Sequence, residues 1–147
     1  MQPHVATFDE LDTRTLLGIL QLRCEVFVAE QECAYADVDG RDAEPGTRHL
    51  WFDEAGTPIA YVRILREPDG SARIGRVCTA KAARGRRLSS ALMATALELI
   101  GPATTSELNA QSYLVGFYEG FGFVPSGPEF LDDGIPHTPM RRSDGSR

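Results

Sequence analysis

Apolar residues recur at helical spacing in two segments of the chain. Over 13–31 they fall three and four residues apart, and Asp12 stands just before the segment as a typical N-cap. The second apolar face covers 88–99 and ends at Gly101-Pro102, a pair that stops a helix. Two amphipathic helices are therefore predicted, the second beginning at about Arg86.

The rest of the chain has the pattern of strands. Apolar runs bounded by turn residues predict strands over 5–8, 49–52, 59–65, 72–79, 105–110, 123–125 and 137–141, with a loop over 33–47 and a short helix over 112–120. Some strands follow one another directly, and others are joined through a helix. The predicted fold class is therefore α+β, a mixed and mostly antiparallel sheet of six to seven strands with helices on both faces. A single domain is expected over 1–141, followed by a polar tail over 142–147.

Composition narrows the classes of protein. The chain has 147 residues, a net charge of −6 and a pI near 5.0, which argues against general nucleic-acid binding. No apolar run approaches the ~18 residues of a membrane span, and the N-terminus lacks a secretory pattern. Cys24, Cys33 and Cys78 are odd in number and show no Cys-x-x-Cys spacing, so neither a disulfide framework nor a zinc site is expected. The protein is expected to be cytoplasmic.

The acidic stretch 37–44 invites comparison with a calcium loop. Arg41 and Asp42 stand where an EF-hand needs its third ligand and its glycine, so the match fails. No metal site is predicted.

The most informative segment is a basic loop between a predicted strand and a predicted helix. Lys81, Arg84, Arg86 and Arg87 place four cations within seven residues, with Gly85 among them. The free backbone N–H groups and the dipole of a helix N-terminus favour an anion there. The segment therefore favours a site for a phosphorylated ligand, with a solvated basic loop as the alternative.

Two motifs carry a resemblance to a known family. The family pattern is Gln or Arg, two residues, Gly, one residue, then Gly or Ala. Here it stands as Arg84-Gly-Arg-Arg87-Leu-Ser89, with Arg87 and Ser89 in place of the two small residues. A second segment, Phe117-Tyr118-Glu-Gly-Phe-Gly122-Phe123, matches the family's aromatic ending. Together they resemble the GNAT superfamily of acyl-CoA-dependent N-acyltransferases, and further segments such as Asp133-Gly-Ile-Pro-His137 are similar to its ElaA-like branch.

The resemblance implies acetyl-CoA, or a related acyl-CoA, as the donor. In the family, the fourth and fifth strands separate at a bulge, and the pantetheine arm fills the gap. The implied cofactor-binding residues are Val77, Cys78, Thr79, Arg84, Gly85, Arg86, Arg87, Leu88, Ser89, Ser90 and Gln111. Tyr118 stands where the family often places a tyrosine near the departing thiolate, with aromatic packing as the alternative. Cys78 has no histidine near it in sequence, so direct transfer of the acyl group is expected.

The acceptor is expected to be a small amine, and its site is less defined. Candidate substrate-binding residues are Arg23, Phe27, Glu30, Arg76 and His137. Arg23 projects from the apolar stripe of the first helix, where a guanidinium needs an anionic partner. That partner is either Glu30 or, with Arg63 or Arg76 assisting, the carboxylate of an amino-acid-like acceptor. The general base is open among Glu30, His49 and His137, because no glutamate occurs over 72–79.

Two alternative functions remain open on the sequence alone. The departures at Arg87 and Ser89 favour a catalytically weak module that binds CoA or a partner. The spacing of Arg23 and Phe27 also occurs in acyl-homoserine-lactone synthases, which are longer. The expected partner is a small-molecule amine rather than nucleic acid or a membrane, and the protein is expected to be a monomer or homodimer.

Overall fold

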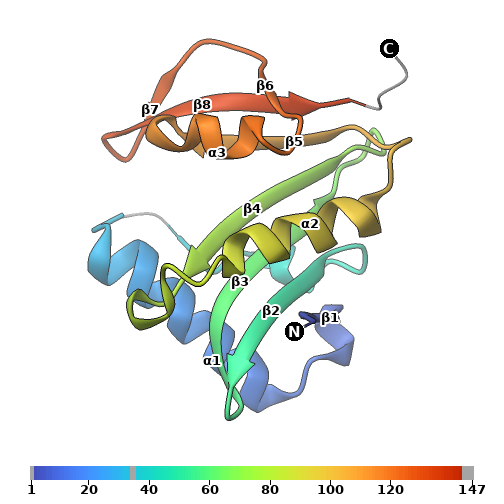
Figure 1. The fold of residues 1–147 in the computed structure, drawn as a ribbon. Helices are drawn as coiled ribbons and strands as arrows, with labels where there is room; N and C mark the ends of the chain where they lie inside the picture. The colour runs from blue at the N-terminus through green and yellow to red at the C-terminus, as the bar shows by residue number, and fades with distance from the viewer. Residues whose placement is uncertain (1, 34–35, 144–147) are drawn as a thin grey trace.

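The computed structural model describes residues 2–33 and 36–143. Its one sheet has the strand order β1-β2-β3-β4-β5-β8-β6, and β7 also pairs with β8 (Figure 1). The strands are β1 His4–Ala6, β2 Arg48–Glu54, β3 Thr57–Arg66, β4 Ala72–Thr79, β5 Ser106–Gln111, β6 Val124–Pro125, β7 Phe130–Asp132 and β8 Ile135–Arg142. The helices are α1 Thr13–Arg23, α2 Leu88–Ile100 and α3 Val115–Glu119. The shorter turns are η1 Phe8–Glu10, η2 Cys24–Glu30, η3 Gly40–Ala43, η4 Lys81–Ala83 and η5 Ser112–Leu114.

The predicted fold class is confirmed, with one strand more than expected. Strand β4 has the predicted bounds, and the other predicted elements agree within a few residues. Strand β7 was missed, although its signal was present. Asp133 and Gly134 both have positive φ, at 54° and 78°, and link β7 to β8 as the two-residue hairpin that an Asp-Gly pair favours.

The first helix begins as predicted, because the Asp12 side chain accepts a hydrogen bond from the Thr15 N–H at 2.7 Å. It does not remain α-helical to its end. After Arg23 the chain continues as a π-helical turn, η2, over Cys24–Glu30. Such turns are often found at functional sites, and apolar spacing alone does not distinguish them from an α-helix.

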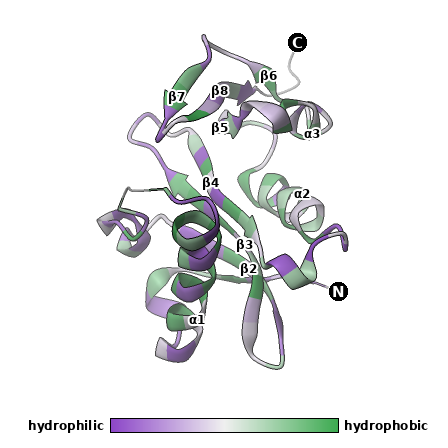
Figure 2. Ribbon diagram, turned by 90° about the vertical axis from the view of Figure 1, so that its left-hand side faces the viewer, coloured by the Kyte–Doolittle hydropathy of each residue, from purple (hydrophilic) through white to green (hydrophobic). Residues whose placement is uncertain are grey.

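The two long helices cover opposite faces of the sheet (Figure 2). Successive side chains of a strand point to opposite faces, so Trp51 and Tyr61 pack with Ile19 under α1 and η2. Their neighbours Leu50 and Val62 pack under α2. Burying each large apolar side chain contributes about 1.5–3 kcal/mol, so both helices are held firmly. The two faces of the sheet are therefore both core.

Strand β4 departs from regular pairing at its centre. Tyr61 pairs with Cys78 and Arg63 with Gly75, so two residues of β4 stand opposite Val62 alone. One of them, Arg76, has a φ of 56°. This is a β-bulge, which bends the strand and alters its twist.

Beyond the bulge, β4 and β5 separate. Their parallel pairing covers only Ala72 with Ser106 and Arg73 with Glu107, and the strands diverge toward their C-terminal ends (Figure 1). The bulge and the separation expected from the family resemblance are both present.

The C-terminal segment differs slightly from expectation. Arg142, predicted to begin the polar tail, belongs to β8, and its Nε donates a hydrogen bond to the Phe121 carbonyl at 3.0 Å. Residue 143 follows the strand, and the rest of the predicted tail, 144–147, lies outside the described residues. Within the described chain, no helix has the length and apolar character needed to cross a membrane.

Candidate active site

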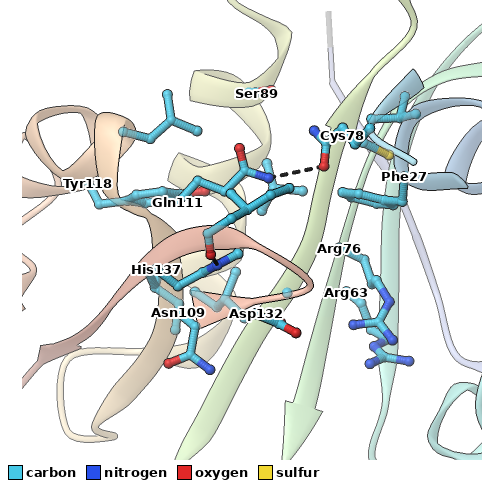
Figure 3. Close-up of a pocket in the computed structure, with 18 of the residues that line it drawn as sticks. Phe27, Arg63, Arg76, Cys78, Ser89, Asn109, Gln111, Tyr118, Asp132 and His137 are labelled. Carbon is cyan, nitrogen blue, oxygen red and sulfur yellow. Dashed lines mark hydrogen bonds between the residues drawn. The ribbon is translucent and has the colours of Figure 1, made fainter. Parts of the chain in front are cut away.

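A cavity of about 510 Å³ lies where β4 and β5 separate (Figure 3). Its walls come from β4, β5, η2, α3 and the β7–β8 hairpin, represented by Val77, Asn109, Phe27, Tyr118 and Asp132. This size is typical of small-molecule sites.

The cavity brings together eleven of the predicted site residues. Those that line it are Phe27, Glu30, Arg76, Val77, Cys78, Thr79, Arg84, Ser89, Gln111, Tyr118 and His137. Six others do not line it: Arg23, Gly85, Arg86, Arg87, Leu88 and Ser90. Five of these six lie in the basic loop and the first turn of α2, next to the lining residues Arg84 and Ser89.

The basic loop ends in the N-terminus of α2. The first intrahelical bond runs from the Ala91 N–H to the Arg87 carbonyl, so the N–H groups of Leu88, Ser89 and Ser90 have no helical acceptor. The helix starts two residues later than predicted, and these three N–H groups form its positive end.

Two residues of this loop adopt left-handed backbone. Gly85 has a φ of 85°, and a Cβ built there would meet no other atom within 4 Å. Arg87 has a φ of 60°, a conformation that favours glycine. Arg87 therefore adopts a backbone conformation that glycine reaches without strain, at a cost of about 1–2 kcal/mol.

The cations of the loop have different partners. Arg84 donates two hydrogen bonds to the Glu30 carboxylate, each 2.7 Å long. This pair lowers the pKa of Glu30 and connects the end of η2 to the loop. Arg86 turns away and pairs with Glu54 at 2.8 Å. Of these two arginines, only Arg84 lines the cavity.

The wall formed by β4 offers backbone groups. The Ala80 N–H donates to the Ile59 carbonyl, and antiparallel alternation then turns the N–H and C=O of Thr79 away from β3. The Thr79 carbonyl accepts from Arg84 Nε at 3.2 Å, which agrees with that orientation. The Thr79 and Ser89 hydroxyls lie 2.9 Å apart and tie β4 to α2.

Tyr118 is buried in an aromatic cluster on α3 and still reaches the cavity. Its ring packs edge-on against Phe117 and Phe123. Burial raises the pKa of the Tyr118 phenol to about 12, with a smaller contribution from Tyr113. The phenol is therefore neutral, and able to donate a hydrogen bond, over the whole physiological pH range.

The expectation for Arg23 is corrected. Its side chain is fully buried, away from the cavity lining. Its Nε lies 3.0 Å from an Asp37 carboxylate oxygen and its Nη1 2.8 Å from one of Asp42. The alternative that Arg23 pairs with a carboxylate of the protein was therefore right. The partner expected for it, Glu30, was wrong, because Glu30 is bound to Arg84.

Arg23 belongs to a larger cluster, the arginine–aspartate cluster, formed by Arg23, Arg63, Arg76, Asp37, Asp39 and Asp42. Arg63 pairs with Asp39 at 2.7 Å and Asp42 at 3.1 Å, and Arg76 with Asp37 at 3.0 Å. Burial opposes ionisation of Asp42, but Arg23 and Arg63 outweigh it and keep the pKa of Asp42 below its usual range. The aspartates of the acidic stretch therefore bind arginines. In the described part of the chain, no three or more His, Cys, Asp or Glu side chains are grouped so that they could hold a metal ion.

The three candidate bases occupy different positions. His49 is fully buried, its ring nitrogens bonded to the Tyr61 hydroxyl and the Asp42 carbonyl, and burial lowers its pKa. Glu30 is held by Arg84. His137 alone among them lines the cavity without an ion pair. Cys78 lines it too, but burial raises the pKa of its thiol far above the ordinary value, so it is a poor nucleophile.

Some lining residues were not foreseen. Gln31 accepts a hydrogen bond from Gln111 at 3.0 Å, which joins η2 to β5 across the cavity (Figure 3). Asn109 stands two residues before Gln111, and this spacing places both on one face of β5. Asp132 comes from β7, the strand that was missed. For Asn109 the strand alternation was a usable signal.

Comparison with known proteins agrees with this architecture. A family model described as an acetyltransferase (GNAT) domain matches residues 15–143. The protein ElaA of Escherichia coli is 41% identical over 138 residues, covering 90% of each chain. A UPF0039 protein of Mycobacterium tuberculosis H37Rv is 45% identical over 137 residues, covering 90% of this chain and 87% of that one.

Solved structures give the same result. The crystal structure of E. coli ElaA superposes with a TM-score of 0.90 at 37% identity, covering 97% of this chain and 99% of that one. An acyl-CoA N-acyltransferase from Pseudomonas aeruginosa does so with a TM-score of 0.90 at 39% identity and the same coverage. The CoA-dependent acyl-homoserine lactone synthase BjaI, at 17% identity and a TM-score of 0.80, shares the fold alone. The chain belongs to the GNAT superfamily of acyltransferases, in its ElaA-like branch.

Proposed function

We propose that this protein is an N-acetyltransferase that transfers an acetyl group from acetyl-CoA directly to the amine of a small acceptor. The observation that carries the proposal is the cavity between β4 and β5, which opens beside the N-terminus of α2. GNAT proteins bind acyl-CoA, and the residues here fit such a ligand. A free helix end suits a pyrophosphate, and an unpaired strand edge suits an extended amide-bearing arm.

The donor is assigned to named groups. The N–H groups of Leu88, Ser89 and Ser90 receive the pyrophosphate, and the left-handed backbone at Gly85 and Arg87 shapes the approach. Arg84 adds charge and exchanges its bond with Glu30 for one with phosphate. Arg86 and Arg87 contribute long-range attraction, since neither side chain lines the cavity.

The pantetheine arm is assigned to the two strand edges. Backbone groups of Val77 and Thr79 receive its amides from the β4 side, and Gln111 from the β5 side. Cys78 forms wall, and a backbone N–H near Val77 polarises the thioester carbonyl. One such donor is worth ~10²–10³ in rate.

Tyr118 acts on the departing sulfur. A phenol with a pKa of about 12 gives its proton to a thiolate of pKa ~8.5 only at a cost of about 5 kcal/mol. Its raised pKa therefore favours hydrogen-bond donation to the developing thiolate over complete proton transfer. This hydrogen bond strengthens as negative charge builds on the sulfur. It therefore stabilises the transition state more than the bound substrate and accelerates the reaction.

Exchanging Arg84 for glutamate tests the donor site. The Michaelis constant for acetyl-CoA is expected to rise tenfold or more, because a cation that lines the cavity becomes an anion facing the pyrophosphate. Arg14→Glu, the same charge change in the exposed first turn of α1, is the control and should leave this constant within twofold. Steady-state kinetics with varied acetyl-CoA provide the measurement, and equal constants in both variants would make the basic loop a surface feature.

A thiol-release assay with acetyl-CoA and a panel of amines tests the activity itself. Acceptor-dependent release of CoA supports the proposal. Binding of acetyl-CoA without release of CoA with any acceptor would favour the alternative of a catalytically weak CoA-binding module.

We also propose that the protein is cytoplasmic and that it acts as a monomer or homodimer on a small-molecule amine.

A further inference from the structure

The arginines of the cavity are already neutralised by the protein. Among the described residues four arginines line it. Each meets at least one carboxylate within 3.1 Å: Arg63 with Asp39, Arg73 with Glu67, Arg76 with Asp37, and Arg84 with Glu30. In the arginine–aspartate cluster, three cations face three anions. The carboxylate of an acceptor would therefore have to compete with these aspartates and glutamates for the arginines that line the cavity.

Asp132 is the exception among the charged lining groups that the structure describes. It ends β7, lies exposed at the cavity and has no hydrogen bond or ion pair with any residue in the described chain. Its register partner is Ile135 of β8, and Figure 3 shows it in the same part of the cavity as His137 and Asn109. A carboxylate without a cation beside it attracts a positively charged ligand.

His137 is fixed in a defined tautomer. Its Nδ1 lies 2.7 Å from the Ile135 carbonyl oxygen, and a carbonyl only accepts, so Nδ1 carries the hydrogen and Nε2 keeps its lone pair. The ring stacks on Phe130 at 5.8 Å between centroids, and His137 pairs in register with Gln111 on β5. The imidazole is therefore oriented from two sides and keeps one basic nitrogen.

We propose that Asp132 and His137 form the acceptor end of the cavity, where Asp132 binds the ammonium group of a cationic amine that has no adjacent carboxylate and His137 Nε2 removes its proton. This inference rests on the proposed function and names its substrate class and general base. Among the other side chains labelled in Figure 3, the ionised ones are Arg63 and Arg76, and both are paired. Burial raises the pKa of the Cys33 thiol, and the negative charges of Asp133 and Asp132 raise it further, so Cys33 lies near both aspartates.

The reaction balances as follows. Nε2 takes one proton from the ammonium, directly or through water, and the freed lone pair forms a bond to the thioester carbon. The tetrahedral intermediate collapses with cleavage of the C–S bond while Tyr118 hydrogen-bonds to the sulfur. The nitrogen loses its second proton as the amide forms, and the thiolate gains one from solvent. The products are the acetylated amine and CoA, and His137 returns its proton to water.

Lysine and 1,5-diaminopentane differ only in a carboxylate, so they test the substrate class. With wild-type protein, kcat/KM for the diamine should exceed that for lysine at least tenfold. Asp132→Asn should raise KM for the diamine about tenfold, whereas Asp9→Asn, on exposed η1, should not change it. Calorimetry with acetyl-CoA is run first. Absence of acetyl-CoA binding would refute the proposed function itself, and this outcome is thereby distinguished from failure of the inference about the acceptor. Equal or better use of lysine overturns the inference, as does bound acetyl-CoA without turnover of the diamine or any other cationic amine.

His137→Gln tests the base with the best cationic acceptor. The variant should bind acetyl-CoA as the wild type does, lose about 10²-fold in kcat and lose the acid limb of its pH–rate profile. His4→Gln, an exposed histidine on β1 that pairs with Asp53, is the control. An unchanged acid limb in His137→Gln would assign deprotonation elsewhere and overturn the role of His137.

Discussion

Replacing Tyr118 by phenylalanine is expected to lower kcat for acetyl transfer by about 10²-fold while leaving the fold and the affinity for acetyl-CoA nearly unchanged. The ring packs against Phe117 and Phe123, and phenylalanine preserves those contacts. Only the hydroxyl is lost, and with it the hydrogen bond to the departing sulfur. Because this bond forms as charge develops, its loss should act on kcat rather than on KM. Pre-steady-state and steady-state kinetics with acetyl-CoA provide the measurement.

Tyr113→Phe is the matched control for this experiment. Tyr113 also lines the cavity, but its side chain is 78% exposed. The control should keep kcat within about threefold of the wild-type value.

Because burial raises the pKa of Tyr118 to about 12, ionisation of its hydroxyl should cause no loss of activity up to about pH 10. Near-normal turnover of Tyr118→Phe would reduce Tyr118 to a packing residue.

Replacing Arg23 by methionine should destabilise the protein by about 3–5 kcal/mol, the usual cost of removing one partner from a buried ion pair. Asp37 and Asp42 would each lose a buried cation, and Asp37 would lose the 2.6 Å hydrogen bond to its carbonyl as well. Burial alone would lower the pKa of Arg23, but Asp42 and Asp37 raise it instead, so the guanidinium is always charged. Urea-induced unfolding followed by circular dichroism measures the change.

Arg141→Met is the control for stability. Arg141 forms a 2.8 Å pair with Glu107 on the surface, and such pairs contribute about 0–1 kcal/mol. Equal stability losses in the two variants would contradict the role given to the arginine–aspartate cluster. Preserved stability of Arg23→Met together with weakened acceptor binding would restore the original expectation that Arg23 binds substrate.

The strand, loop and helix that carry the basic loop could be predicted well from sequence because their signals are local. A strand, a loop with Gly85 and a helix follow one another within 30 residues, and each has its own apolar pattern. The motif departure at Arg87 was misleading in one respect. Arginine stands where the pattern has glycine, yet its backbone is left-handed. Residue type alone does not determine φ at such a position.

The residues expected to bind the acceptor could not be placed from sequence because their contacts are long-range. Arg23 needed an anionic partner, and the helical spacing favoured Glu30. The partners that it found, Asp37 and Asp42, lie 14 and 19 residues away across a loop. A β-hairpin whose first strand has three residues brings His137 and Asp132 to the same cavity. Register between such short strands is set by the fold as a whole, so sequence alone placed His137 in the site but not its neighbour.

Titration calorimetry of the folded wild-type protein with CoA and acetyl-CoA tests the central claim, that the separated edges of β4 and β5 hold a thioester-bearing nucleotide. We expect saturable heat with one site per chain for both ligands, and binding weakened at least tenfold in Arg84→Glu. Absence of heat with both ligands would contradict the account.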